Sequence, residues 1–292
     1  MHTRLLIAAL FALFGLGIAC SKADSPTSPT PADGPIFYTA IGASDGIGFG
    51  SSSPCVPFTD CPDGKGYVQI LRRRLRDAFP GRTVAHRNQS IPGAVLSKAI
   101  EDLARDIGQP INELAGNFIE RQAPFVDTTT THVTIFAGGN DANVIGRAAL
   151  AGRGGSDPSA YIDAQVRQWG VDLEDLVARI RVRAPNARIV ALNMINLAGA
   201  PYVASRPQSE KSIMQRIAVG ISDRVNALTA RQVLVVDLMC DARLYQASNY
   251  SSDGFHPGDG GYAIFAEDAL PALKDGANNQ PNTGCAQRRL FP

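Results

Sequence analysis

The sequence carries almost no excess charge of either sign. Its 292 residues include 28 lysines and arginines against 27 aspartates and glutamates, which gives a formal net charge of +1. Binding of nucleic acid depends on a strong positive field, so this balance does not indicate a nucleic-acid partner. The local basic run Arg72-Arg73-Arg74 falls in a segment of apolar helical period and indicates the solvent-facing side of a helix.

Patterns that bind metal ions are also missing. The five cysteines include no CxxC pair, and their spacings do not group into a ligand set for zinc. His86 and His132 lie in or beside strand-like runs, with no acidic residue at ligand spacing. We therefore expect no metal site. The hydrophobic content of 45% is sufficient for the core of one α/β domain.

The start of the chain has the features of an export signal. Residues 5–18 form an apolar run that is too short to span a bilayer comfortably. Cys20 directly follows Ala19, and this arrangement resembles a bacterial lipoprotein signal, in which Cys20 becomes the lipidated first residue of the mature chain. Ordinary signal-peptidase cleavage after Ala19 or Ala23 is the alternative, because Gly17 stands where the lipoprotein signal usually has leucine.

A segment rich in Ser, Pro and Thr follows and has the composition of a flexible tether. The chain is thus predicted to consist of a signal peptide over residues 1–20, a tether over residues 21–34 and one folded domain over residues 35–292. We expect a protein of the cell envelope, in the periplasm, the outer membrane or on the surface, that touches the membrane only through Cys20. Without lipidation it would be secreted.

The remaining cysteines support export independently. Once Cys20 is set aside, Cys55, Cys61, Cys240 and Cys285 remain, an even number behind a secretory start. Four cysteines allow three pairings. Cys55 and Cys61 flank a short Pro-rich loop and suit one bridge, which leaves Cys240 and Cys285 to hold the C-terminal tail.

Apolar runs of strand length alternate with segments of helical period. The predicted strands cover residues 36–42, 83–88, 132–137, 188–194 and 233–238. The predicted helices cover residues 67–79, 97–107, 161–183, 209–229 and 261–273. Such alternation predicts a parallel sheet that helices cover on both faces, with ligands at the carboxyl ends of the strands.

Four short polar segments carry the chemistry. They are Gly42-Ala43-Ser44-Asp45, Asn88-Gln89-Ser90-Ile91-Pro92-Gly93, Gly138-Gly139-Asn140-Asp141 and Asp253-Gly254-Phe255-His256-Pro257. The first and third directly follow predicted strands. Because the carboxyl ends of parallel strands meet at one edge of a sheet, Ser44 and Asn140 can share one crevice.

The first and last segments together have the groups of an activated nucleophile. A serine hydroxyl becomes nucleophilic when an imidazole takes its proton, and that imidazole needs an acceptor that fixes its tautomer and orientation. Asp253 and His256 are three residues apart on a tight turn, so the carboxylate can hold Nδ1–H while Nε2 faces Ser44. These three residues are therefore the predicted catalytic residues.

The same site needs donors for the negative charge that develops on a carbonyl oxygen under attack. The backbone N–H groups of Ser44 and Gly93 and the side-chain amide of Asn140 are the candidates for this oxyanion hole. Glycine at position 93 lets the backbone approach a substrate closely, and an asparagine amide stays uncharged at every relevant pH.

This arrangement resembles the SGNH, or GDSL-type, hydrolases, whose four named residues would here be Ser44, Gly93, Asn140 and His256. The likeness covers residues 37 to about 270. It implies a flavodoxin-like three-layer α/β/α sandwich around a central parallel sheet. It also implies hydrolysis of carboxylic or related acyl esters without a metal or cofactor.

One residue departs from the family pattern, one rival motif overlaps it, and a second rival motif follows directly. Ala43 replaces the aspartate of the usual Gly-Asp-Ser, which affects the local hydrogen bonding more than the chemistry. The run Gly42 to Gly46 also fits the G-x-S-x-G elbow of α/β-hydrolases, but Ser44 follows the first predicted strand, too early for that fold. A dinucleotide-binding glycine pattern over residues 46–51 fails, because Ser51 stands at its last glycine.

We expect a monomeric serine hydrolase that cleaves a small-molecule or carbohydrate acyl ester, with preference for acetyl or other short acyl groups. The Gly-, Ser- and Pro-rich stretches over residues 48–66 and 142–158 are expected to form the rim of the crevice. A non-catalytic envelope binding module on the same scaffold is the alternative from another class. Lysophospholipase or thioesterase activity would use the same residues.

Overall fold

A computed structural model describes residues 33–109, 111, 114–277 and 280–291, in which five strands alternate with eight α-helices. The strands are β1 (Ile36–Ile41), β2 (Val84–Asn88), β3 (His132–Phe136), β4 (Arg188–Leu192) and β5 (Leu234–Val236). The helices are α1 (Ser44–Ile47), α2 (Tyr67–Ala78), α3 (Lys98–Asp106), α4 (Phe118–Arg121), α5 (Gly139–Leu150), α6 (Pro158–Arg183), α7 (Gln208–Ala227) and α8 (Asp259–Asp275). The predicted signal peptide, Cys20 and nearly all of the tether lie outside the described residues.

The sheet is parallel throughout, with the strand order β2-β1-β3-β4-β5. This is the flavodoxin-like order, in which the chain reverses direction across the sheet between β1 and β3. The predicted α/β class with a central parallel sheet is confirmed. β1 lies beside the middle of the sheet because its apolar side chains fill both faces, and only Phe37 of this strand is exposed.

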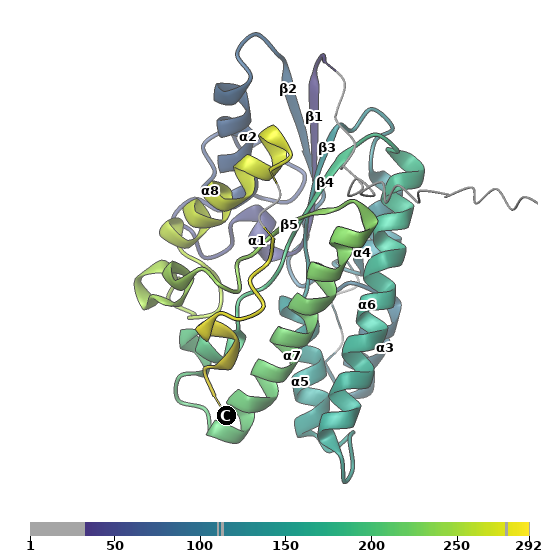
Figure 1. Ribbon diagram of the computed structural model, residues 1–292, viewed down its shortest axis with the longest axis vertical. Helices are drawn as coiled ribbons and strands as arrows, with labels where there is room; N and C mark the ends of the chain where they lie inside the picture. Colours follow the sequence, from purple (N-terminus) through teal and green to yellow (C-terminus); the bar gives the residue numbers. More distant parts are fainter. Residues whose placement is uncertain (1–32, 110, 112–113, 278–279, 292) are drawn as a thin grey trace, which may run out of the picture.

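Side chains of the strands alternate between two separate cores. On one face, Tyr38 of β1 and Val190 of β4 pack with α2 and α8. On the other face, Ile41 of β1 and Ile189 of β4 pack with α3, α5, α6 and α7. Figure 1 shows α2 and α8 on one side of the sheet and the other long helices on the opposite side. Burial of both faces explains why β1 and β4 are mostly apolar, whereas the edge strand β2 carries His86, Arg87 and Asn88 and is only partly buried.

The prediction that residues 142–158 form a loop at the rim of the crevice is wrong, because most of this stretch belongs to α5. Residues 141, 142, 144, 145, 148 and 149 are buried, which is the period of a helix that packs one face against the sheet. Only residues 151–157 connect α5 to α6, where Asp157 accepts a hydrogen bond from the N–H of Ala160 at 2.8 Å and begins α6. The Gly-Gly-Asn-Asp run that ends β3 is the first turn of α5.

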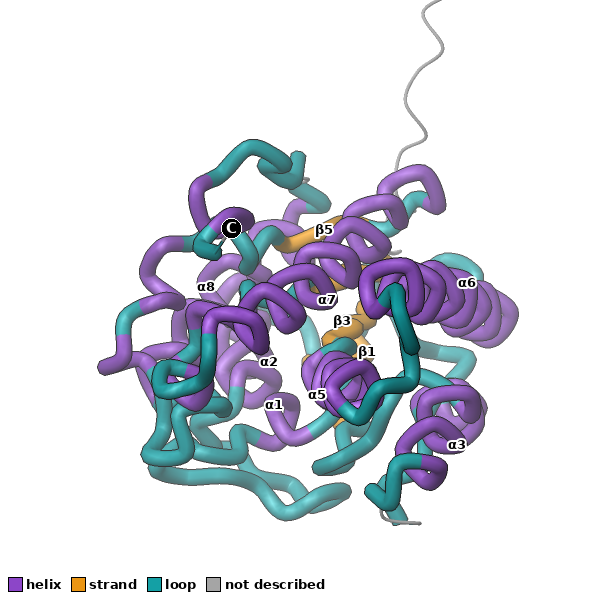
Figure 2. Tube along the Cα trace, turned by 90° about the horizontal axis from the view of Figure 1, so that it is seen from below, coloured by secondary structure: helices purple, strands orange, loops and turns teal. Residues whose placement is uncertain are grey.

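Two short polar connections bring helices to the carboxyl ends of the strands. β1 leads through Gly42 into α1, and β3 leads through Gly138 into α5. Viewed from below, α1 and α5 lie next to each other at this end of the sheet (Figure 2). Gly138 has a φ of +121°, and a Cβ there would lie 2.9 Å from Ile221, so this turn requires glycine.

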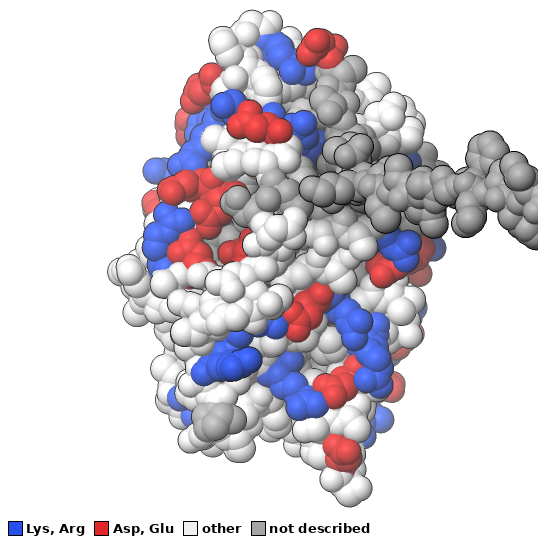
Figure 3. Space-filling model, in the orientation of Figure 1, with Lys and Arg blue, Asp and Glu red and all other residues white. Residues whose placement is uncertain are grey.

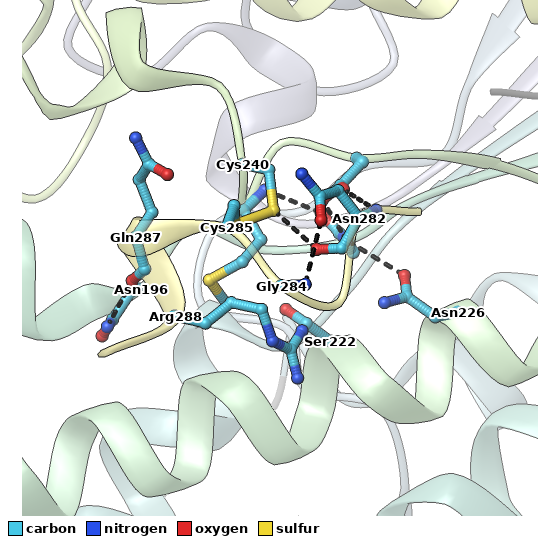
Figure 4. Close-up of a disulfide and its surroundings, with 12 residues drawn as sticks. Asn196, Ser222, Asn226, Cys240, Asn282, Gly284, Cys285, Gln287 and Arg288 are labelled. Atoms are coloured by element: carbon cyan, nitrogen blue, oxygen red, sulfur yellow. Dashed lines mark hydrogen bonds between the residues drawn. A yellow bond between two sulfur atoms is a disulfide. The ribbon is translucent and has the colours of Figure 1, made fainter. Parts of the chain in front are cut away.

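Two disulfides join the cysteines in the predicted pairs. Cys55 and Cys61 close a short loop with a Cα–Cα distance of 5.9 Å. Cys240 and Cys285 are 5.8 Å apart at Cα and hold the C-terminal tail against the domain (Figure 4). Beyond this bridge, Arg288 donates a hydrogen bond to Asp223 of α7 at 2.7 Å. Disulfides persist in oxidising compartments, so they indicate an exported protein.

Lysines and arginines are interspersed with acidic residues on the face drawn in Figure 3. Within the described ranges, none of the helices combines the length and the apolar character needed to cross a membrane.

Candidate active site

Ser44 is the first residue of α1 and is buried to 5% exposure at the carboxyl end of β1. The backbone that leads from β1 to Ser44 is held by the side-chain amide of Gln122. This amide accepts a hydrogen bond from Gly42 N at 3.0 Å and donates one to Gly42 O at 2.9 Å. The next turn packs tightly on the second polar segment, because a Cβ at Gly46 would lie 1.9 Å from Ser90 Oγ. The position of the Ser44 hydroxyl is therefore set from both sides.

The structure brings Ser44, His256 and Asp253 into one hydrogen-bonded line. Ser44 Oγ lies 2.9 Å from His256 Nε2, across 212 residues of sequence. His256 Nδ1 lies 2.6 Å from Asp253 Oδ2. With Nδ1 protonated toward the carboxylate, Nε2 presents its lone pair to the serine hydroxyl, which is the tautomer that a general base requires.

Four donors hold the Asp253 carboxylate. One oxygen accepts hydrogen bonds from Ser251 Oγ at 2.7 Å, Phe255 N at 2.8 Å and His256 N at 2.9 Å, while the other faces the imidazole. Partial burial opposes ionisation, but the hydrogen bonds from the His256 ring, the backbone and Ser251 outweigh it and lower the pKa of Asp253 to about 2. The carboxylate is therefore ionised at every pH at which an imidazole can act as a base.

Two aromatic rings confine the imidazole. The ring centroid of Phe49 lies 4.7 Å from that of His256, and the ring centroid of Phe255 lies 4.9 Å away. Phe49 belongs to the predicted rim over residues 48–66, so part of that stretch does border the site. Sequence reasoning did not assign Phe255 a role, although it precedes the histidine directly.

Two of the three predicted oxyanion donors, Ser44 and Asn140, line one cavity together with Ala94, the neighbour of the third donor, Gly93. Asn140 Nδ2 donates one hydrogen bond to Ala94 O at 2.9 Å, which orients the amide and leaves its second N–H available. Gly93, the neighbour of Ala94, has a φ of +83°, a conformation that favours glycine. Among the described residues, no acceptor takes the backbone N–H of Ser44 or of Gly93.

Asp141 of α5 binds the backbone of the segment that follows the predicted oxyanion donor Gly93. Sequence reasoning did not predict this role. Its side chain is 1% exposed, and Oδ1 accepts a hydrogen bond from the N–H of Leu96 at 2.8 Å. Burial raises the pKa of Asp141 to about 6, and the hydrogen bond from the Leu96 N–H offsets this only in part. Nothing but its position beside Asn140 marks this residue in the sequence.

This raised pKa makes the folding stability depend on pH. Because the folded protein binds the proton more tightly than the unfolded chain, the contribution of Asp141 is complete below about pH 4 and is lost as the pH rises through about 6. The measured quantity is the difference between the unfolding free energies of the wild type and of Asp141→Asn. This difference is expected to fall by about 3 kcal/mol between about pH 4 and about pH 6. Urea denaturation of both proteins measures the difference, and a constant or rising value would contradict the assignment.

Two small cavities adjoin the nucleophile. One of 10 Å³ is lined by Ser44, Asn140 and the glycines between β3 and α5, which is space for a single oxygen-sized group. A second of 40 Å³ shares Asp45, Phe136 and Phe255 with the first and is otherwise mostly apolar. A larger cavity of 680 Å³ lies along the edge strand β2, where Phe58 lines it, and none of the predicted site residues does.

The remaining titratable groups near the sheet do not form a second centre. Burial lowers the pKa of His86 to about 4 and that of His132 to about 3, so both rings are neutral. Burial raises the pKa of Asp45, which lines the apolar cavity beside Ser44. In the part of the chain that the structure describes, no three His, Cys, Asp or Glu side chains are grouped to hold a metal ion.

Comparison with known proteins agrees with this geometry. The model of the GDSL-like lipase/acylhydrolase family matches residues 40–264. No curated protein matches.

Solved structures show the same fold at low sequence identity. The lipase Lip_vut3 from a goat rumen metagenome is 17% identical, with a TM-score of 0.56 over 81% of this chain and 97% of that one. An extracellular lipase from Streptomyces rimosus is 19% identical, with a TM-score of 0.51 over 83% of this chain and 100% of that one. A phospholipase A1 from Streptomyces albidoflavus NA297 is 17% identical, with a TM-score of 0.51 and the same coverage.

Proposed function

This chain belongs to the GDSL-like lipase/acylhydrolase family, and we propose that it hydrolyses short acyl esters with Ser44 as the nucleophile. The observation that carries the proposal is the hydrogen-bonded line from Ser44 Oγ through His256 to Asp253, at 2.9 Å and 2.6 Å. The second support is the cavity that Ser44, Ala94 and Asn140 line, since Ser44, Asn140 and Gly93, the neighbour of Ala94, are the proposed oxyanion donors.

Acylation follows from the positions of these groups. As Ser44 Oγ attacks the ester carbonyl, His256 Nε2 takes the hydroxyl proton, and the carbonyl π electrons move to the oxygen. The N–H donors of Ser44, Gly93 and Asn140 stabilise this oxyanion, and each donor contributes about 10² to 10³ in rate. When the tetrahedral intermediate collapses, the bond to the alcohol oxygen breaks, and the imidazolium returns its proton to that oxygen.

Deacylation repeats the same sequence with water. His256 accepts a proton from water while the water oxygen attacks the acyl carbonyl, and the proton then passes to Ser44 Oγ as the acid leaves. Asp253 stabilises the imidazolium in both halves and stays ionised, in keeping with its pKa of about 2. The products are one carboxylic acid and one alcohol.

The small apolar cavity beside Ser44 supports a short acyl group. Its volume of 40 Å³ exceeds the space that one water molecule occupies by only a few fold, which corresponds to about three or four heavy atoms. Phe136 at the end of β3, Met194 just beyond β4 and Phe265 of α8 line it. Acetyl to butyryl groups fit this space, whereas long acyl chains would have to displace packed side chains.

A series of p-nitrophenyl esters tests the proposed function. We expect kcat/KM for acetate and butyrate to exceed that for decanoate by about tenfold or more, because the additional methylene groups of decanoate do not fit into the small cavity. Ser44→Ala, assayed in parallel, corrects for hydrolysis without the enzyme. A rate that increases steadily with chain length would indicate a long-chain lipase, and hydrolysis no faster than with the variant would refute esterase activity.

A further inference from the structure

A groove of 430 Å³ lies between α5 and α7. One wall is formed by residues of α5, namely Asn143, Gly146, Arg147 and Leu150. The other wall is formed by Tyr202, Val203, Arg206, Glu210 and Met214. Phe255, whose ring contacts the ring of His256, also lines the groove. The groove and the catalytic imidazole are therefore neighbours through Phe255.

The spacing of polar residues along α5 gives the distance between the proposed oxyanion donor Asn140 and Arg147. Asn140, Asn143 and Arg147 stand at positions i, i+3 and i+7 of the helix, so they lie on one face. Seven residues of α-helix span about 10 Å. A ligand whose carbonyl oxygen is held by Asn140 thus reaches the level of Arg147 about 10 Å further along.

The groove has an uncompensated positive charge. Arg147 is exposed, and its guanidinium group has no hydrogen bond or ion pair with any described residue. Arg206 faces it across the groove and pairs with Glu210 at 3.4 Å. Tyr202, whose hydroxyl donates to Asn143 Oδ1 at 3.3 Å, lies within reach of the charges of both arginines. Two guanidinium groups and one carboxylate leave one net positive charge.

The direction of the reaction decides which half of the ester enters the groove. The leaving alcohol must lie against His256 to receive its proton, and Phe255, which packs on that imidazole, also lines the groove. The cavity of 40 Å³ proposed for the acyl group is a separate one that Phe255 lines too. The alcohol portion therefore extends along α5, over the apolar side chains of Met214 and Val203, toward Arg147.

We propose that this groove selects esters whose alcohol portion carries a carboxylate or phosphate group about 10 Å from the reacting carbonyl, bound by Arg147 and Arg206. Guanidinium groups bind either anion through paired N–H donors. The inference rests on the proposed esterase function, and it names the substrate class of the same site.

Matched substrates separate this inference from the esterase function itself. Octyl acetate is the neutral reference, while 8-acetoxyoctanoate and 8-acetoxyoctyl phosphate carry the anion at the end of the alcohol chain, and released acetate is measured. We expect kcat/KM to be about tenfold or more higher for at least one anionic ester, because a charge-assisted hydrogen bond contributes at least this factor. Whether the carboxylate or the phosphate is preferred identifies the anion.

Variants then assign the preference to the groove. Arg147→Gln is expected to lower the ratio of anionic to neutral kcat/KM about tenfold, and Glu210→Gln is expected to raise it, since it removes the opposing charge. Arg179→Gln, at an exposed position of α6 that pairs with Asp175, should leave the ratio unchanged. The ratio should also fall as the salt concentration rises.

Three results would overturn the inference while leaving the esterase intact. One is equal hydrolysis of neutral and anionic acetates by the wild type. Another is an Arg147→Gln variant that slows both kinds of ester by the same factor, as a structural defect would. The third is a preference for an anion on the acyl side, measured as mono-p-nitrophenyl suberate against p-nitrophenyl octanoate. If the wild type hydrolyses none of these esters, the proposed function fails and this inference fails with it.

Discussion

Replacement of Ser44 by alanine is expected to lower kcat for p-nitrophenyl acetate by about 10⁴-fold or more. An acyl-enzyme at this site needs the Ser44 hydroxyl, which lies 2.9 Å from His256 Nε2, and alanine offers no atom that could carry the acyl group. What remains should be the small rate that the oxyanion donors alone give to attack by water. Steady-state kinetics on the purified domain measure the loss.

A matched control is available on the same chain. Ser159 is an exposed serine near the start of α6, so Ser159→Ala makes the same chemical change away from the site. Its kcat should equal that of the wild type. Combining Ser44→Ala with His256→Ala should cost no more than Ser44→Ala alone, because residues that act as one unit are not additive. Activity of Ser44→Ala close to that of the control would contradict the assignment.

Replacement of Asp253 by asparagine is expected to lower kcat by about 10⁴-fold at neutral pH. The amide can donate to Nδ1, so it favours the tautomer that carries its proton on Nε2, where a lone pair is needed. Because the pKa of Asp253 is about 2, the wild-type carboxylate does not titrate at the pH of assay. Kinetics across the neutral and alkaline range measure the loss.

The pH profile distinguishes this role from a structural one. If Asp253 only capped the turn through its bonds to Phe255 N and His256 N, asparagine could replace one acceptor oxygen and keep much of the activity. We expect the variant to recover at high pH, where hydroxide can act in place of the misoriented base. A wild-type profile and wild-type kcat in Asp253→Asn would refute the orienting role.

The fold was predictable because most of its strands are short, buried and mainly apolar runs. β3 and β4 bury residues on both faces, so they stand out from the sequence, and their alternation with helices leaves few topologies. α5 was missed because its first turn is made of Gly139, Asn140 and Asp141, residues that are typical of loops. The apolar period further along the helix was the signal that could have identified it.

Some polar side chains hold the backbone around the catalytic residues, and these could not be predicted from the sequence. Ser44, Asp253 and His256 are recognisable because their chemistry requires those residue types in short motifs. Gln122 and Asp141 each bind a backbone group far away in sequence, Gly42 in one case and Leu96 in the other. A single buried polar residue does not indicate its partner until the fold is known. Arg147 is similar, since only the groove gives its spacing from Asn140 a meaning.

Covalent trapping of Ser44 tests the central claim most directly. A fluorophosphonate reacts only with a serine whose hydroxyl a neighbouring base has activated, so mass spectrometry of the labelled protein reports the nucleophile. The account predicts one adduct, on the peptide that contains Ser44, formed much more slowly in His256→Ala. Labelling of another serine, or labelling of Ser44 at the same rate without His256, would contradict it.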